Sequence, residues 1–214
     1  MPKDALILVD VQKDFMPDGA LPAPGGYGVA PVANRLVDHF DLVVATQDWH
    51  PPNHGSFASN HEGCDTGDII NLDGVDQILW PDHCVQQSEG AEFVDELRID
   101  EVDEIFQKGT NPKIDSYSGF FDNDHRQATG MGEYLKGEGV ESIFLVGVAT
   151  DYCVKFTALD GCKLDFETWV VVDGCAGVGD DILDVDAAFA DMRKAGARLI
   201  DSGILQRVKA ARSA

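Results

Sequence analysis

Runs of consecutive apolar residues recur along the chain, separated by segments in which apolar residues return every three or four positions. The runs cover residues 5–10, 41–47, 104–108, 142–148 and 168–173, with a weaker one at 198–201. Helical spacing covers residues 30–40, 131–138, 151–163 and 180–195. Strands buried on both faces are apolar throughout, so this alternation predicts a parallel sheet with helices on both sides.

The order of these elements favours one domain of the α/β class over residues 1–214. Because connections between parallel strands are right-handed, alternating strands and helices produce a three-layer α/β/α sandwich. The stretch at residues 53–79 does not fit this alternation, since it is long, polar and irregular. A long irregular segment in a compact domain is usually functional, and we expect a lid or an insert beside the site there.

Acidic residues dominate the charge of the chain. There are 38 acidic against 16 basic side chains, which gives a formal net charge of −22 at pH 7. Phosphate backbones and anionic membranes both require a cationic surface, so we expect no nucleic acid and no membrane among the partners. A protein adapted to high salt and an ordinary acidic enzyme both fit this composition.

The N-terminus and the cysteines bear on the compartment. The first apolar run is short, ends in Asp10 and is not followed by a small-residue cleavage site. It therefore predicts a buried strand instead of a signal peptide, and no run of 18 apolar residues could span a membrane. The five cysteines are widely spaced and form no CxxC pair. These features are typical of a cytoplasmic protein with free thiols.

Reactive side chains follow the predicted strands directly. Asp10, Asp48 and Lys108 end the first three runs, and Cys153 lies in the turn after the fourth. In open parallel sheets, ligands bind beyond the carboxyl ends of the strands. We therefore expect these four side chains to face the same edge of the sheet.

Cys153 lies where a strand turns into a helix. A thiol in the first turn of a helix is expected to have a lowered pKa, and the free N–H groups there can stabilise an oxyanion. Both properties favour a nucleophile, as in the strand-turn-helix elbow of other hydrolases. A buried cysteine that only packs the helix is the alternative. We interpret the other four cysteines as structural residues that pack in the core or lie in loops.

Asp10 and Lys108 supply the groups that a cysteine nucleophile needs. A carboxylate at the end of an apolar strand has a raised pKa when it is desolvated, so Asp10 could accept the thiol proton. The ammonium group of Lys108 would hold a nearby thiolate ionised and orient the acid. Each residue alone is more simply a surface charge after a strand. The convergence of three such residues on one edge strengthens the catalytic interpretation.

Two segments that contain histidine predict a metal site. Asp48 and His50 lie two residues apart in an extended turn, so both side chains can face the same way. His54 is within reach, and His83 belongs to a second loop. Aspartate and histidine together suit zinc, iron or manganese. The alternative is that these histidines bind no metal and simply lie on the surface or in the core. We interpret the other three histidines in this way.

Five motifs in this order resemble those of the isochorismatase-like cysteine hydrolases, in their nicotinamidase branch. They are Val9-Asp-Val-Gln-Lys-Asp-Phe15, Thr46-Gln-Asp-Trp-His50, Trp80-Pro-Asp-His-Cys-Val85, Lys108-Gly109 and Gly147-Val-Ala-Thr-Asp-Tyr-Cys-Val154. Each motif is short, but together they span most of the chain. The resemblance implies a six-stranded parallel sheet of strand order 3-2-1-4-5-6. It also implies hydrolysis of nicotinamide to nicotinate and ammonia through a cysteine thioester, as a step of NAD salvage.

The resemblance further implies a role for individual residues. The implied catalytic triad is Asp10, Lys108 and Cys153. The implied oxyanion hole is formed by the N–H groups of Ala149 and Cys153, and the bond between Val148 and Ala149 matches the position of a cis peptide.

The implied ligands and substrate walls complete the site. One divalent metal ion, zinc before iron or manganese, would be held by Asp48, His50 and His83, with His54 as a further ligand in some members. The aromatic walls around the substrate ring match Phe15, Trp80 and Tyr117. Association into a homo-oligomer through exposed helices also fits this family.

Several alternative functions were open at this level. An amidase for a carbamoyl, ureido or maleamate substrate would share the fold and the triad, but such relatives generally lack the metal set. An isochorismatase lacks the nucleophilic cysteine. A nucleotide-dependent oxidoreductase is suggested only by Gly174-Cys-Ala-Gly-Val-Gly179, which has the wrong order and follows the fifth strand instead of the first. A non-catalytic binding module is disfavoured by the intact triad.

Overall fold

A computed structural model describes residues 3–179 and 182–212 of the chain. Six parallel strands form its central sheet: β1 (Lys3–Val9), β2 (Leu42–Asp48), β5 (Glu104–Lys108), β6 (Val140–Val148), β7 (Glu167–Ala176) and β8 (Arg198–Ile200). Their order in the sheet is β5-β2-β1-β6-β7-β8. Counted within this sheet alone, that is the order 3-2-1-4-5-6. The predicted class and strand order are therefore confirmed.

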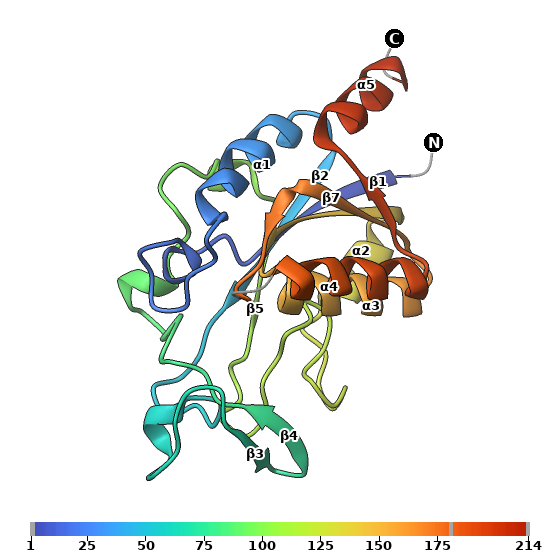
Figure 1. The fold of residues 1–214 in the computed structure, drawn as a ribbon. Helices are drawn as coiled ribbons and strands as arrows, with labels where there is room; N and C mark the ends of the chain where they lie inside the picture. Colours follow the sequence, from blue (N-terminus) through green and yellow to red (C-terminus); the bar gives the residue numbers. More distant parts are fainter. Residues whose placement is uncertain (1–2, 180–181, 213–214) are drawn as a thin grey trace.

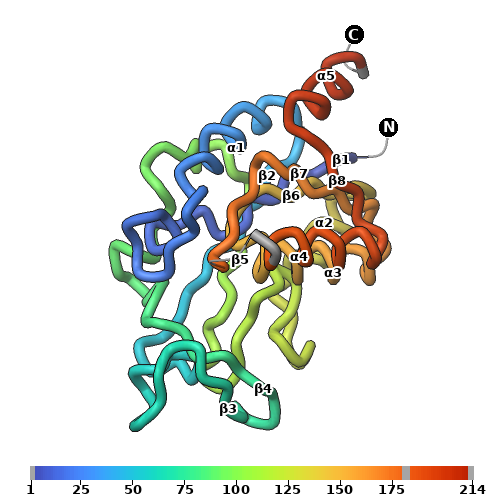
Figure 2. The backbone as a smooth tube through the Cα atoms, in the orientation of Figure 1, coloured from blue at the N-terminus to red at the C-terminus, as the bar shows by residue number. Residues whose placement is uncertain are grey.

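Helices cover both faces of the sheet (Figures 1 and 2). On one face lie α1 (Val29–Val37) and α5 (Ser202–Arg212), and on the other lie α2 (Met131–Gly137), α3 (Lys155–Lys163) and α4 (Ile182–Ala195). The last helix, α5, had no counterpart in the sequence analysis. The predicted helix at 180–195 corresponds to α4, and its first two residues lie outside the described residues.

Two apolar cores follow from the alternation of side chains along the strands. On β1, Leu6 and Leu8 pack with α1 in one core, whereas Ala5, Ile7 and Val9 face the other core together with residues of α2, α3 and α4. All five of these side chains are fully buried. Both faces of β1 are buried at these positions, so its side chains there must all be apolar. This explains the unbroken apolar run at the start of the chain.

The insert, residues 53–79, is more regular than its composition indicates. It contains an antiparallel hairpin of β3 (Ile69–Leu72) and β4 (Val75–Ile78), which lies apart from the central sheet (Figure 1). Its two-residue turn, Asp73 and Gly74, has positive φ at both positions, as a tight hairpin turn requires. On β3 the exposed positions are Ile69 and Asn71 and the half-buried ones are Ile70 and Leu72, so apolar residues occur on both faces and the strand shows no clear alternation.

Short helical turns connect the main elements. The 3-10 turns are Lys13–Phe15, Gly26–Gly28, Ala58–Asn60, Glu89–Ala91 and Ile99–Glu101, and a π-helical turn covers Thr150–Val154. Among the described residues, every helix is too short or too polar to cross a bilayer.

Candidate active site

The carboxyl ends of three strands bring the predicted triad together. Asp10 follows β1, Lys108 ends β5, and Cys153 lies in the π-helical turn after β6. Lys108 Nζ is 3.0 Å from Asp10 Oδ2 and 3.5 Å from Cys153 Sγ. The three residues are 0%, 2% and 5% exposed, so the site largely excludes water. An acid, a cation and a thiol in contact can move a proton and present a sulfur nucleophile.

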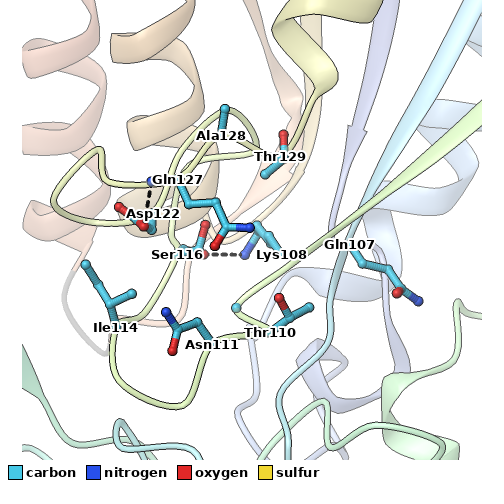
Figure 3. Close-up of a pocket in the computed structure, with 11 residues that line it drawn as sticks. Gln107, Lys108, Thr110, Asn111, Ile114, Ser116, Asp122, Gln127, Ala128 and Thr129 are labelled. Atoms are coloured by element: carbon cyan, nitrogen blue, oxygen red, sulfur yellow. Dashed lines mark hydrogen bonds between the residues drawn. The ribbon is translucent and has the colours of Figure 1, made fainter.

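Lys108 is held by four neighbours. Besides Asp10 and Cys153, its Nζ donates to Asp48 Oδ1 at 3.0 Å and to the carbonyl oxygen of Ser116 at 2.9 Å. Figure 3 shows the bond to Ser116 beside a small polar cavity that borders Lys108. Burial opposes the charge of this ammonium group, but the two carboxylates raise its pKa well above the ordinary value. The lysine therefore stays charged and links the triad to Asp48.

The backbone at Asp10 turns sharply so that its side chain points into the site. Its φ is +49°, in the left-handed region that non-glycine residues rarely adopt. Thr46 Oγ1 accepts a hydrogen bond from Asp10 N at 3.2 Å and donates one to Asp10 Oδ1 at 2.7 Å. Burial raises the pKa of this carboxyl group, and Lys108 acts in the opposite direction. The pKa shift expected for Asp10 is therefore present.

The turn that carries Cys153 corrects one expectation. The α-helix begins only at Lys155, so the thiol lies in the preceding π-helical turn, whose N–H groups at Tyr152 and Val154 both donate to the carbonyl oxygen of Ala149. Burial raises the pKa of the Cys153 thiol well above its ordinary value, although Lys108 opposes this. The expected lowering by a helix N-terminus is absent, because burial outweighs it. The bond between Val148 and Ala149 is cis, as the resemblance implied.

Three residues form a group that could hold a metal ion: Asp48, His50 and His83. Asp48 Oδ2 lies 3.1 Å from His50 Nε2 and 3.5 Å from His83 Nε2. The opposite ring nitrogens, Nδ1, lie 2.9 Å from the carbonyl oxygen of Gly109 and 2.8 Å from that of Pro81. A carbonyl only accepts, so both Nδ1 atoms carry protons. In a neutral ring Nε2 is then a bare acceptor that faces a carboxylate, and a bound cation would satisfy both groups. This donor set therefore fits a divalent metal.

His54 lies beside this group but is oriented differently. Its ring centroid is 4.4 Å from that of His50, and the side chain is fully buried. His54 Nδ1 lies 2.7 Å from Ser56 Oγ and 3.2 Å from the backbone nitrogen of Ser56. Burial lowers the pKa of His54 to about 4, which keeps the ring neutral. His54 Nε2 has no hydrogen-bond partner among the described residues, and His54 forms a second group that could hold a metal ion with His50 and Asp115.

A pocket of about 310 Å³ opens onto Cys153 and the metal-binding group. Its walls include the three aromatic residues expected from the sequence: Phe15, Trp80 and Tyr117. Trp80 Nε1 donates to Tyr117 Oη at 3.1 Å, so two of these walls are joined directly. Most of the lining side chains are aromatic or apolar, which suits a ligand with a flat ring.

The family of the chain follows from its similarity to known proteins. The family model of the isochorismatase domain matches residues 4–203. The chain belongs to the isochorismatase family. Within this family, a nicotinamidase of Escherichia coli is 48% identical over 203 residues, which cover 93% of this chain and 95% of the relative.

Two solved structures of the isochorismatase family agree with this placement. A nicotinamidase/pyrazinamidase of Acinetobacter baumannii has a TM-score of 0.91 and 42% identity, with 96% of this chain and 99% of that chain covered. A pyrazinamidase of Pyrococcus horikoshii in complex with zinc has a TM-score of 0.75 and 38% identity, with 94% and 99% covered. The shared fold thus extends over nearly the whole chain.

Other residues of the pocket were missed by the sequence analysis. They are Leu21, Asp115, Tyr152 and Val178. Tyr152 could have been found, since it directly precedes Cys153, and its ring centroid lies 4.8 Å from that of Trp80. Asp115 gave no signal, because it lies in an irregular loop and only the fold turns it toward the site.

Gly109 is predicted to be essential for the metal-binding group. Its φ is +65°, and a Cβ atom there would lie 2.4 Å from His50 Cε1 and 2.6 Å from His50 Nδ1. Gly109→Ala is therefore expected to displace His50 and to weaken zinc binding by about tenfold or more. Competition with a chromophoric chelator measures this affinity. Gly137→Ala is the control, since a Cβ there meets nothing within 4 Å. Equal affinities for the two variants would contradict the prediction.

Proposed function

We propose that this chain is a nicotinamidase that hydrolyses nicotinamide to nicotinate and ammonia, a step of NAD salvage. The observation that carries the proposal is one buried pocket in which Cys153, its neighbours Asp10 and Lys108, and a metal-binding group converge. The names of the family relatives support the same substrate. The reaction adds one water molecule and breaks the exocyclic C–N bond.

The substrate ring is proposed to lie between Phe15 and Trp80, with the carboxamide near Cys153. Tyr117 closes the pocket beside Trp80. A divalent metal ion on Asp48, His50 and His83, which we propose to be zinc before iron or manganese, would bind the pyridine nitrogen and so orient the ring. The insert at residues 53–79 would form a wall of this pocket and carries His54.

Formation of the thioester is the first half of the proposed reaction. Asp10, whose pKa is raised by burial, takes the proton of the Cys153 thiol while the sulfur attacks the carboxamide carbon. The N–H groups of Ala149 and Cys153 stabilise the negative oxygen of the tetrahedral intermediate. Asp10 then gives the proton to the departing nitrogen, ammonia leaves, and a thioester remains.

Hydrolysis of the thioester completes the cycle. Asp10 takes a proton from a water molecule, whose oxygen attacks the thioester carbon. The carbon–sulfur bond breaks, the sulfur regains a proton, and nicotinate leaves. Lys108 holds both reacting groups throughout, because its Nζ contacts Asp10 Oδ2 and Cys153 Sγ together. A positive charge in this place stabilises the transient thiolate, which compensates for the raised pKa of the resting thiol.

Release of ammonia from a panel of small amides tests this function. We expect turnover of nicotinamide and of pyrazinamide, which also carries a ring nitrogen meta to the carboxamide group. Benzamide, which lacks the ring nitrogen, is expected to react at least about tenfold more slowly because it cannot be oriented by a metal. Incubation with a chelator should remove this preference. Faster hydrolysis of carbamoyl, ureido or maleamate substrates would contradict the proposal and favour the related amidases.

A further inference from the structure

The insert places one polar side chain inside the molecule. Gln77 on β4 is only 2% exposed. Its amide nitrogen lies 2.7 Å from the carbonyl oxygen of Ile78, 3.2 Å from Asp115 Oδ2 and 3.1 Å from Tyr117 Oη. Asp115 and Tyr117 both line the pocket that opens onto Cys153. One side chain of the hairpin therefore contacts two walls of the pocket from behind.

The orientation of the Gln77 amide follows from its neighbours. The Ile78 carbonyl and the Asp115 carboxylate can only accept, so the nitrogen of the amide, and not its oxygen, faces them. Its two N–H protons are shared among three acceptors, the third of which is Tyr117 Oη at 3.1 Å. Tyr117 Oη also accepts from Trp80 Nε1 at 3.1 Å. The hydroxyl group of Tyr117 is therefore held between Gln77 and Trp80.

The hairpin is anchored to the same loop at a second place. Arg126 Nη1 lies 2.9 Å from Asp73 Oδ2, and its Nη2 donates to the carbonyl oxygen of Asp73 at 2.9 Å. Asp73 forms the tip of the hairpin, whereas Arg126 and Asp115 belong to one loop between β5 and α2. The hairpin thus rests on this loop through its tip and through Gln77, which makes Gln77 a fixed support and not a mobile side chain.

We propose that Gln77 is a positioning residue that sets Tyr117 and Asp115 in the pocket, so that the insert controls how tightly the substrate is held. The proposal rests on the proposed function. Gln77 contacts none of Asp10, Lys108 and Cys153, so a substitution of Gln77 leaves the three groups of the chemical step in place.

The carbonyl of Ser116 that holds Lys108 has supports other than Asp115. The backbone N–H of Ser116 donates to Asp115 Oδ1 at 2.8 Å, and its Oγ separately donates to the carbonyl oxygens of Ser118 at 3.1 Å and Phe121 at 2.9 Å. The anchor of Lys108 therefore remains when the Gln77 amide is lost. Removal of this amide should consequently act on substrate binding and not on turnover.

Gln77→Met tests this role, because methionine keeps the length of the side chain and removes the amide. We expect KM for nicotinamide to rise about tenfold while kcat changes less than about threefold, as the loss of two hydrogen bonds to pocket walls predicts. Asp76→Asn on the same strand is the control and should leave both values unchanged, since Asp76 is exposed. An unchanged KM, or a fall in kcat alone, would overturn the proposal.

A double-mutant cycle separates positioning from a general loss of stability. In the Tyr117→Phe background the hydroxyl group is absent, so Gln77→Met should raise KM by less than about threefold. A full tenfold effect in that background would contradict action through Tyr117. If Gln77→Met does not fold, Gln77→Glu replaces it. This variant retains the shape but sets a second carboxylate beside Asp115, and it should raise KM at least as much.

A measurement without substrate keeps this inference separate from the proposed function. The indole proton of Trp80, assigned among the three tryptophans by Trp80→Phe, should shift in the NMR spectrum of Gln77→Met and not in that of Asp76→Asn. An unshifted resonance would refute the role of Gln77. Wild-type protein that releases no ammonia from nicotinamide would instead refute the proposed function, whatever the resonance shows.

Discussion

Replacing Cys153 by alanine is expected to lower kcat for nicotinamide by about a thousandfold or more, because no other group in the pocket can form the thioester. The thiol lies 3.5 Å from Lys108 Nζ and borders the substrate pocket. Ammonia release under saturating substrate measures the effect. Retention of more than a few per cent of wild-type turnover would exclude a covalent mechanism.

Cys162→Ala is the matched control for this substitution. Cys162 lies on α3, which directly follows the π-helical turn of Cys153, and it packs against the same apolar core. Its loss should leave kcat within about twofold of the wild type, since surface and partly buried positions of this kind have small effects. A nicotinoyl adduct on Cys153, detected by mass spectrometry after rapid acid quenching, would identify the intermediate directly.

Replacing His50 by alanine is expected to lower zinc affinity by more than about a hundredfold, which exceeds the usual effect of residues around a metal ligand. His50 Nε2 lies 3.1 Å from Asp48 Oδ2, and its other nitrogen is held by the Gly109 carbonyl, so this ring is fixed with Nε2 toward the metal-binding group. Metal content after dialysis and competition with a chelator give the affinity. The pocket should then lose its preference for pyridine carboxamides over benzamide.

His61→Ala provides the comparison for the metal prediction. His61 Nε2 contacts the carbonyl oxygen of Gly55 at 2.8 Å, so this ring serves the insert and not the metal-binding group. Its variant should bind zinc as tightly as the wild type. A His50→Ala variant with one tightly bound zinc ion per chain would show that the ion lies elsewhere.

The position of His54 shows where sequence reasoning stopped. Its spacing from His50 allowed either a metal ligand or a neighbouring group. The structure places His54 in a group with His50 and Asp115 that could hold a metal ion, so its role as a ligand stays a prediction. Spacing along the chain cannot place Asp115 beside these histidines, since only the fold brings this loop residue to them.

The direction of the Cys153 pKa shift is a second property that sequence reasoning could not predict. The sequence places the thiol near the start of a helix, which alone would favour the thiolate. In the folded protein the side chain is 5% exposed and lies near two carboxylates, and these raise its pKa. Burial in three dimensions outweighed a local electrostatic effect, and only the packed structure contains the information on burial.

The sequence by itself determined the sheet, its strand order through the family resemblance, and the residue types at each strand end. This was predictable because the periods of apolar residues are local, and because parallel strands must meet at one edge. The tertiary structure alone decided the contacts of Lys108 with two carboxylates, the hairpin in the insert, the presence of Asp115 in the pocket wall and that of Gln77 behind it. These depend on contacts between segments far apart in the chain, such as the one between Gln77 and Tyr117. Polar side chains on irregular loops carry no periodic signal, so their partners emerge only when the loops pack.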